Sequence, residues 1–326
     1  MNYQGTNRNG TAARAEGDTP PLRFGLIGLD SPHAPSFTRL FGDGRDGREA
    51  PDDRDGHNGR VPGGTVVSAW KGEPAADFPL GRDRVDAFAS AVAEMGVTLY
   101  GTPEEVAESC DALLVVAADA RTHPAHFLRL APYGKPVYVD TRFALTGADA
   151  RAMLAAAHAG GCLPLAGSPK RFVPEFREAL GAAGRAERID LTGPLPTQPG
   201  HPHLAWYGVH LVDLAVAALG PGCAQVDATA AERTTLTWED GRVATLGGDS
   251  VWSPFTIGRV HAGGREREFV IEAGEPMLTG LLASLVDACD SGVPNVPEAE
   301  VLEIVAVVEA AGRSRDLGVP VAPERS

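Results

Sequence analysis

The sequence predicts an α/β fold in two parts: an N-terminal doubly wound parallel sheet, and a C-terminal α+β domain built on an open, mainly antiparallel sheet. Two observations lead to this prediction. Up to residue 167, short apolar segments alternate with segments of helical periodicity, and such alternation is typical of βαβ units. Beyond it, strand-like segments follow one another, with hairpin turns at Asp240-Gly241 and Gly263-Gly264.

The first half contains the segments of a parallel sheet. The run 112–117 is continuously apolar, which is typical of a parallel strand buried on both faces. Thr102 and Glu105 form a capping box with Pro103 at the first helical position. Ser31 can cap the first helix, with Pro32 at its first position. We expect strands at 23–28, 65–70, 98–100, 112–117, 137–140 and 163–166, and helices at 31–41, 84–95, 102–110, 123–131 and 148–159.

The second half is mostly strand-like, with one helix among the strands and two long helices at its end. The final helix carries an apolar face at Val301, Ile304, Val305 and Val308, which have helical spacing. We expect strands at 188–192, 224–231, 234–238, 243–246, 256–260 and 267–272, and helices at 204–219, 277–290 and 298–313.

Composition excludes several classes of protein. The 326 residues include 29 Lys and Arg against 43 Asp and Glu, a net charge of −14, which opposes binding to nucleic acid. The longest apolar run, 112–118, is far shorter than the ~20 residues of a membrane span. The four cysteines are far apart and form neither a zinc pattern nor a disulfide framework. We therefore expect a cytoplasmic protein, without nucleic-acid or membrane partners, that binds a small molecule.

Three regions follow from these patterns. Residues 1–21 are polar and predict a disordered tail without a secretory signal. Residues 22–167 form the expected dinucleotide-binding domain. Residues 168–326 form the expected substrate and oligomerisation domain, because an open apolar sheet face is costly to leave in water and favours a homo-oligomer. The Gly-, Asp- and Arg-rich segment 42–60 predicts a solvated loop.

Four stretches occur in a characteristic order: 24–33 (FGLIGLDSPH), 133–144 (YGKPVYVDTRFA), 206–213 (WYGVHLVD), and the helix pair flanking Gly292-Val293-Pro294. Together they resemble the glucose–fructose oxidoreductase and inositol dehydrogenase (Gfo/Idh/MocA) family over residues 22 to 322. The resemblance implies a Rossmann domain, an open-faced second sheet, a nicotinamide cofactor and a sugar-like or polyol-like substrate.

The catalytic motifs of that family are altered here. Members carry an acidic-Lys-Pro motif at the end of the fifth strand, and here Asp140 keeps the acidic place while Thr141 and Arg142 replace Lys and Pro. Members also carry Asp four residues before a catalytic His, and here His210 is kept while Trp206 replaces Asp. Because neither Thr nor Trp can replace a titrating group, we expect His210 to carry the proton alone, with activity titrating near pH ~6.5.

The glycine-rich loop is altered as well. The pattern G-x-G-x-x-G would place glycines at 28, 30 and 33, but only Gly28 is present, and Asp30 and His33 take the other places. Ser31 opens the helix whose N-terminus would face a pyrophosphate. After the second strand, Lys71 replaces the usual acidic partner of the ribose 2′-hydroxyl, which favours NADP over NAD. We expect Asp119 and Asp140, which follow the fourth and fifth strands, to complete the cofactor site.

The remaining candidates surround the expected substrate. Arg142 and Thr141 would orient an anionic group, since a guanidinium matches a carboxylate bidentately. Trp206, His203 and Asp213 are further substrate-binding candidates, although Asp213 can equally form a local hydrogen bond.

Two more residues can assist His210. Lys170 and Tyr207 are the candidates to replace the missing Lys, although the Lys170-Arg171-Phe172 stretch has a structural interpretation too. His201 and His203 could join His210 as metal ligands, but no carboxylate or Cys completes the set at a recognisable spacing, so we expect no metal site.

Three hypotheses remain at this point. The first is an NAD(P)-dependent oxidoreductase acting on a small polar, anionic or sugar-like substrate, with His210 as acid/base. The second is a non-redox enzyme on the same scaffold, such as a cyclase, lyase or hydrolase, because function depends on the site and not on the fold. The third is a metabolite sensor without catalysis. The Ala-, Gly- and Arg-rich composition suggests a GC-rich bacterial genome, which is compatible with specialised metabolism.

Overall fold

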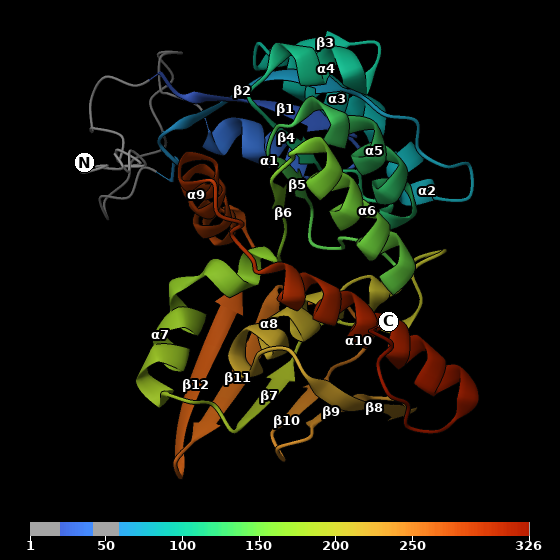
Figure 1. The fold of residues 1–326 in the computed structure, drawn as a ribbon, viewed down its shortest axis with the longest axis vertical. Helices are drawn as coiled ribbons and strands as arrows, with labels where there is room; N and C mark the ends of the chain where they lie inside the picture. The colour runs from blue at the N-terminus through green and yellow to red at the C-terminus, as the bar shows by residue number, and fades with distance from the viewer. Residues whose placement is uncertain (1–19, 42–58, 326) are drawn as a thin grey trace, which may run out of the picture.

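A computed structural model describes residues 20–41 and 59–325 in two stacked domains (Figure 1). The expected tail 1–21 therefore lies mostly outside the described residues, as does the expected loop 42–60. The first domain is a six-stranded parallel sheet in the order β3-β2-β1-β4-β5-β6. Its strands are β1 (Leu22–Ile27), β2 (Gly64–Trp70), β3 (Thr98–Tyr100), β4 (Ala112–Val115), β5 (Val137–Val139) and β6 (Pro164–Leu165).

Helices cover both faces of this sheet. The strand order reverses between β1 and β4, and open sheets of this order bind ligands at that reversal, outside the carboxyl ends of the strands. The helices of the domain are α1 (His33–Leu40), α2 (Pro79–Arg82), α3 (Val85–Glu94), α4 (Pro103–Ser109), α5 (His123–Leu130) and α6 (Gly147–Gly160), with the short 3-10 helices η1 (Ala120–Thr122) and η2 (Ala131–Tyr133).

The second domain is a six-stranded mixed sheet in the order β12-β11-β7-β10-β9-β8. Only the β7–β10 pair within it is parallel, so the expectation of a mainly antiparallel sheet is confirmed. Its strands are β7 (Arg188–Thr192), β8 (Cys223–Ala230), β9 (Arg233–Trp238), β10 (Val243–Gly247), β11 (Phe255–Ala262) and β12 (Arg265–Glu272).

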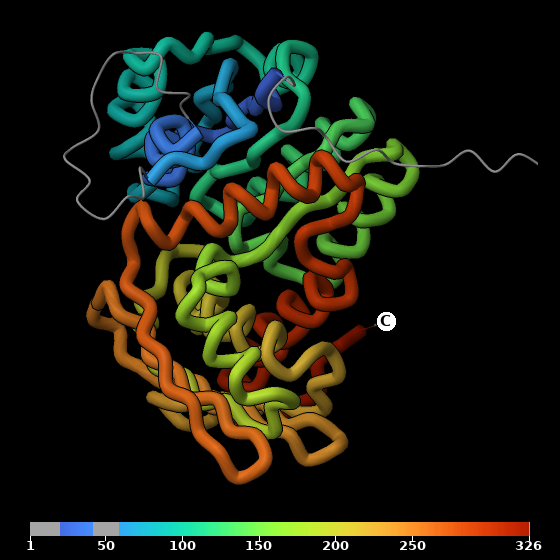
Figure 2. The backbone as a smooth tube through the Cα atoms, turned by 90° about the vertical axis from the view of Figure 1, so that its left-hand side faces the viewer, coloured from blue at the N-terminus to red at the C-terminus, as the bar shows by residue number. Residues whose placement is uncertain are grey.

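Helices cover one face of the second sheet. Helix α7 (Pro174–Ala183) packs on β11 and β12, α8 (Val209–Leu219) on β7 and β10, and α10 (Glu298–Leu317) on β8. The tube view in Figure 2 shows the opposite face of this sheet at the edge of the molecule, without a helix over it. The short helix η3 (Pro169–Phe172) leads from the first domain into the second, and η4 (His203–Ala205) contacts α8 and α10.

Helix α9 (Glu275–Ser291) returns to the first domain (Figure 1). Its buried leucines, among them Leu281 and Leu285, belong to the hydrophobic core of the first sheet. Glu275, at its start, accepts hydrogen bonds from Ser36 at 3.1 Å and from Arg39, both on α1. The first core therefore includes a helix beyond the sequence-based boundary at residue 168.

Local sequence signals predict most element ends. The capping box forms as expected: Thr102 Oγ1 accepts the Glu105 N–H, and the Glu105 carboxylate accepts the Thr102 N–H. Helix α1 begins at His33, one residue after the expected first position, with Pro32 at the N-cap and Ser31 Oγ accepting the His33 N–H. No helix in the described ranges is both long and apolar enough to cross a membrane.

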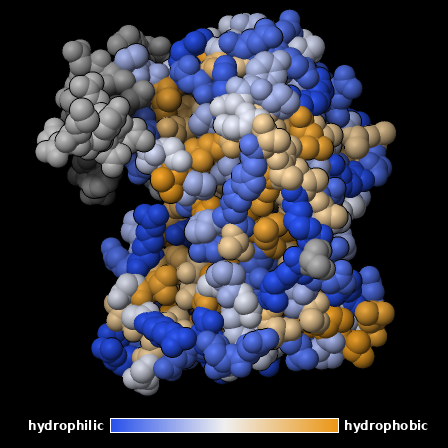
Figure 3. All heavy atoms as spheres, in the orientation of Figure 1, coloured by the Kyte–Doolittle hydropathy of each residue, from blue (hydrophilic) through white to orange (hydrophobic). Residues whose placement is uncertain are grey.

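Apolar side chains remain exposed on the uncovered sheet. Ile257 of β11 and Val270 of β12 are direct cross-strand partners, and each is nearly half exposed, as is Phe255. In the view of Figure 3, further apolar residues reach the surface near the boundary between the domains. A sheet face of this kind favours burial against a second copy of the chain.

We predict that the uncovered sheet face forms a homodimer. Light scattering at micromolar concentration should give about twice the 34.0 kDa chain mass. Ile257→Glu combined with Val270→Glu should give the monomer mass, because charges cannot be buried without partners. Val293→Glu, at an exposed position between α9 and α10, is the matched control and should leave the mass unchanged. A wild-type monomer would contradict the prediction.

Candidate functional site

The candidate site lies where the carboxyl ends of β1, β4 and β5 face the second domain. Gly28, which follows β1, has a φ of +80°, and a Cβ there would come within 2.6 Å of the Ala117 Cβ. Glycine is therefore required at position 28, as the sequence predicts. The residues that follow, Asp30 to His33, turn into α1 and bring polar side chains to this edge of the sheet.

Asp140 is the buried centre of the first polar group. Its carboxylate contacts His33 Nδ1 at 2.6 Å and accepts hydrogen bonds from the Tyr138 and Thr141 hydroxyls at 3.0 and 3.1 Å. Burial alone would raise the pKa of Asp140, but the charge and hydrogen bond of His33, together with Arg142, lower it. Asp140 is therefore an anion, and it fixes His33 through Nδ1, as the carboxylate of an Asp–His pair does.

The altered strand-five motif changes the local path of the chain. Thr141 has a φ of +45°, which is unusual for a β-branched residue, and its hydroxyl is held by Asp140. The following Arg142 turns towards the second domain. Its guanidinium carbon lies 4.2 Å from the centre of the Trp206 ring, and Nη1 donates to the Trp206 carbonyl at 3.2 Å. The replaced Pro and Asp positions, Arg142 and Trp206, thus contact each other.

Arg142 has an incompletely satisfied guanidinium. Its Nε is buried without a hydrogen-bond partner, and no carboxylate of the described residues forms an ion pair with it. Burial lowers its pKa, while Asp140 acts in the opposite direction. A partly buried cation with an unused donor is suited to an anionic ligand.

His210 is held from the second domain by Ser168. Its Nδ1 lies 2.7 Å from Ser168 Oγ, and the Ser168 N–H donates to Asp213 at 3.0 Å. Asp213 also pairs with Arg171 at 2.7 Å. Asp213 therefore positions the loop that holds His210. Among the described residues, no group pairs with His210 Nε2.

Burial determines the protonation of His210. Loss of solvent lowers its pKa well below 6.5, and the positive charges of Lys170 and Arg142 lower it further. The sequence-based expectation that activity titrates near 6.5 used the pKa of a solvated imidazole, whereas burial lowers the pKa of this histidine. A neutral imidazole with a free Nε2 can accept or donate a proton according to its tautomer.

Lys170 is the second cation of the site. It is almost fully buried, and Nζ donates to Thr256 Oγ1 of β11 at 2.6 Å. Burial lowers its pKa to about 8, so its ammonium can release a proton near neutral pH. Unlike its neighbour Arg171, which pairs with Asp213 and Glu300, it forms no ion pair with a described carboxylate.

Two aromatic rings, those of Tyr207 and Trp206, lie beside His210. The Tyr207 ring lies 5.8 Å from the His210 ring in an edge-to-face arrangement, and Trp206 lies beside Tyr207 at 6.1 Å. Trp206 is buried, and its ring packs on Phe78 and His201. Tyr207 and Trp206 thus both lie at the site, as expected from the sequence.

Other predicted residues lie elsewhere or have partners of their own. Lys71 forms an exposed ion pair with Asp86. Asp119 is buried and accepts several hydrogen bonds from Arg121. The structure does not bring His203 to the cluster, since its ring nitrogens contact Thr234 at 3.1 Å and Arg315 at 2.9 Å.

Three histidines, His201, His203 and His210, were the candidate metal ligands in the sequence. His201, His203 and His210 have separate partners, and the described ranges contain no cluster of three or more His, Cys, Asp or Glu that could hold a metal.

Sequence reasoning missed several residues of the site. Ser168 was not predicted, although it contacts His210, and Tyr138 was assigned only to a strand. His33 was predicted to contact a cofactor and not to pair with Asp140. The signal that was present is the alternation along β5, which places Tyr138 and Asp140 on the same side of the strand.

Comparison with known proteins identifies the fold. No family model and no curated protein matches the sequence. Solved structures do match: a probable dehydrogenase from Thermotoga maritima has a TM-score of 0.73 at 15% identity, covering 92% of this chain and 98% of that one. Myo-inositol 2-dehydrogenase from Lactobacillus plantarum has a TM-score of 0.69 at 18% identity, covering 94% and 100%.

A third similar structure contains ligands. Scyllo-inositol dehydrogenase from Lactobacillus casei, with bound NAD(H) and scyllo-inositol, has a TM-score of 0.70 at 12% identity and covers 93% of this chain and 99% of that one. The chain therefore has the two-domain fold of the Gfo/Idh/MocA oxidoreductases, as its motifs suggest. All three of these structures are named as dehydrogenases, and one of them contains NAD(H).

We predict that His210 is neutral at pH 6. Its nitrogen chemical shifts should show no titration near 6.5, because its pKa is lowered by burial. The unfolded chain still binds a proton near pH ~6.5, so this histidine removes stability as the pH falls below that value. His210→Gln should weaken the loss of stability on acidification, whereas the exposed His158→Gln should not. A His210 titration near 6.5 would contradict the assignment.

We predict that Thr141→Val destabilises the fold by about 2 kcal/mol. The change keeps the side-chain shape but removes the hydroxyl that donates to the buried Asp140 carboxylate, and hydrogen bonds to charged groups contribute roughly this much. Urea denaturation measures the difference. Thr237→Val, on β9 in the second sheet, is the matched control. Equal midpoints for the two variants would show that the Thr141 hydroxyl contributes nothing.

Proposed function

We propose that the cluster at the domain boundary is an active site that transfers protons on a small, polar, anionic substrate. The observation that carries the proposal is that two cations near His210 have no ion pair with a described carboxylate: Lys170, which is buried, and Arg142, which is partly buried with its Nε out of solvent. Leaving such charges buried without a counter-ion is costly, so a site of this kind favours a substrate that supplies the negative charge.

Each residue has a distinct task in this proposal. Arg142 binds and orients the anionic group through its unused Nε–H. His210 accepts or returns the proton at Nε2, while Ser168 holds Nδ1. Lys170, with a pKa of about 8, adds positive charge and can supply a second proton. The His33–Asp140 pair borders the site from the first domain, and Tyr207 packs against His210.

Two reaction classes use this proton transfer. An NAD(P)-dependent oxidoreductase is favoured by the fold comparisons, and Lys71 then favours NADP. A non-redox enzyme, such as a cyclase, lyase or hydrolase, is favoured by the replacement of the usual Lys and Asp by Thr141 and Trp206. A sensor without catalysis would need the charges of the site but not a proton acceptor.

The nicotinamide cofactor that the fold implies fits this chain poorly. Gly28 has the conformation that a dinucleotide loop requires. Asp30, however, stands where a second glycine lets the backbone approach the pyrophosphate, and its side chain is buried in the loop. We therefore assign no step of the reaction to a nicotinamide.

We predict that the site binds a hydroxy-carboxylate and not a neutral polyol. L-Tartrate should raise the melting temperature and give a saturable calorimetric titration, whereas myo-inositol should not. Arg142→Met should abolish tartrate binding, and Arg142→Lys should weaken it about tenfold, because the charge stays but the planar fork is lost.

Arg129→Met is the matched control for this test, since Arg129 also lies over a tryptophan ring but is exposed and outside the site. It should bind tartrate as the wild type does. Equal tartrate affinity in the wild type and in Arg142→Met would contradict the proposed role of Arg142.

A further inference from the structure

The segment that follows β2 lies over the carboxyl ends of β1 and β4, where sheets of this order bind dinucleotides. A Cβ at Gly81 would come within 2.3 Å of Asp30 Oδ2, so the backbone of α2 lies directly on the Asp30 carboxylate. Phe78, just before α2, is fully buried and packs on Ala118, which follows β4. The protein's own chain thus occupies the space in front of both strand ends.

Asp30 fills the loop from within. Its carboxylate is almost fully buried and accepts the Ala118 N–H at 2.8 Å, so it joins the end of β1 to the end of β4. Burial raises its pKa, while the hydrogen bond from Ala118 opposes that rise. In the dinucleotide-binding loop this position is a glycine because a side chain would keep the backbone from the pyrophosphate.

The N-terminus of α1 offers few free donors to a phosphate. Pro32 has no N–H group. The His33 N–H donates to Ser31 Oγ at 3.2 Å, and the Ala34 N–H donates to the Ser31 carbonyl at 3.1 Å. A pyrophosphate at this helix would therefore meet internal hydrogen bonds where dinucleotide-binding helices present free N–H groups.

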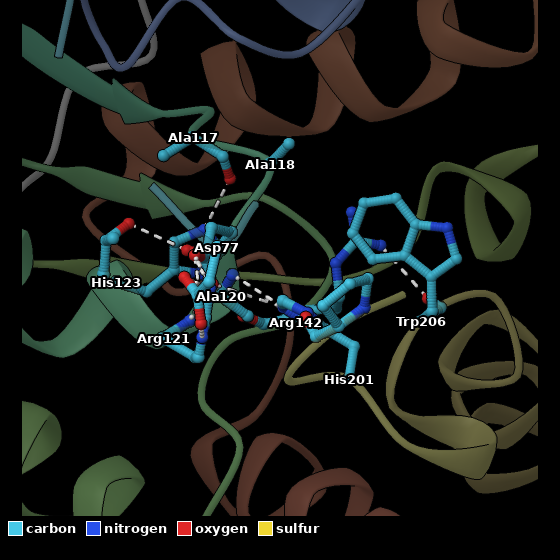
Figure 4. Close-up of polar contacts among 12 residues, drawn as sticks. Asp77, Ala117, Ala118, Ala120, Arg121, His123, Arg142, His201 and Trp206 are labelled. Carbon is cyan, nitrogen blue, oxygen red and sulfur yellow. Dashed lines mark hydrogen bonds and ion pairs between the residues drawn. The ribbon is translucent and has the colours of Figure 1, made fainter. Parts of the chain in front are cut away.

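The second domain closes the same space from the other side. His201 is fully buried, and its Nε2 accepts the Ala120 N–H at 3.0 Å (Figure 4). The Phe78 ring lies 5.5 Å from the His201 ring and 5.8 Å from the Trp206 ring. Residues from both domains thus pack together around Phe78.

An arginine network fixes this arrangement. Arg121 donates to both carboxylate oxygens of Asp77, at 2.7 and 3.0 Å, and also to the buried Asp119 (Figure 4). A Cβ at Gly200 would lie 2.8 Å from Arg121 Cδ, so the loop before His201 rests on the same side chain. The Asp77–Phe78 segment is therefore tied to the end of β4 and covered by the second domain.

We infer that this chain works without a dinucleotide, because its own side chains close the dinucleotide crevice. The inference rests on the proposed function and deepens it: of the two reaction classes, it selects the non-redox one. The substrate gains and loses protons at the site of His210, and no hydride leaves it. Arg142 and Lys170 remain available to an anionic substrate, whereas Asp30, Phe78 and Trp206 fill the crevice at the ends of β1 and β4.

Titration of the full chain with NADH and NADPH, followed by nicotinamide fluorescence and calorimetry, tests this inference. The titrations are run with and without L-tartrate, in case one ligand orders the site for the other. We expect no saturable binding of either nucleotide up to millimolar concentration. Saturable micromolar binding of NADH or NADPH by the wild type would overturn the inference.

A double variant tests the assigned cause. Asp30→Gly with Phe78→Ala removes both obstructing side chains and should give saturable NADPH binding at least tenfold below the millimolar limit tested for the wild type, with circular dichroism as the check on folding. A folded double variant that still shows no saturable NADPH binding would overturn the role given to these two side chains.

The tartrate titration separates this inference from the proposed function. Tartrate binding with no nucleotide binding supports both. Nucleotide binding together with tartrate binding overturns the inference and leaves the anion site in place. If the protein binds neither tartrate nor a nucleotide, the proposed function is contradicted, and the inference of a closed crevice is supported.

Discussion

The buried carboxylate of Asp140 is the constraint on which the site depends. A carboxylate in the interior must be paired and hydrogen-bonded, because its desolvation is otherwise too costly. Asp140 meets this need with His33 from α1, Tyr138 from its own strand and the hydroxyl of Thr141. Two of these contacts have a further effect: His33 is drawn to the end of β5, and Thr141 is held in a left-handed conformation that redirects Arg142.

The altered motifs are therefore connected and do not represent independent losses. His33, at the place of the third loop glycine, becomes the partner of Asp140. Arg142, at the place of Pro, rests on Trp206, which stands at the place of the usual Asp. Asp30, at the place of the second glycine, bonds to Ala118. In each case the side chain that departs from the family pattern contacts another part of the site, which is what a rebuilt site requires and a merely decayed one does not.

Sequence reasoning predicted the fold well because the relevant signals are local. The capping box at Thr102, the apolar run 112–117 and the hairpin turn at Asp240-Gly241 each act within a few residues, and each element forms close to its predicted position. The site was predicted less completely because its contacts are distant in the chain. His33 and Asp140 are 107 positions apart, and Ser168 and His210 are 42 apart. No periodicity or spacing encodes such pairs.

The same reasoning explains why Phe78 was not recognised. It lies in a segment without strong periodicity, and its burial depends on Trp206 and His201, which belong to the other domain. A glycine loop with missing glycines predicts weaker dinucleotide binding, but it cannot predict what replaces the dinucleotide. Only the packing of three separate segments shows that the protein fills the space itself. The fold therefore relates this chain to the dehydrogenases, while the side chains at its strand ends favour a different use of the same crevice.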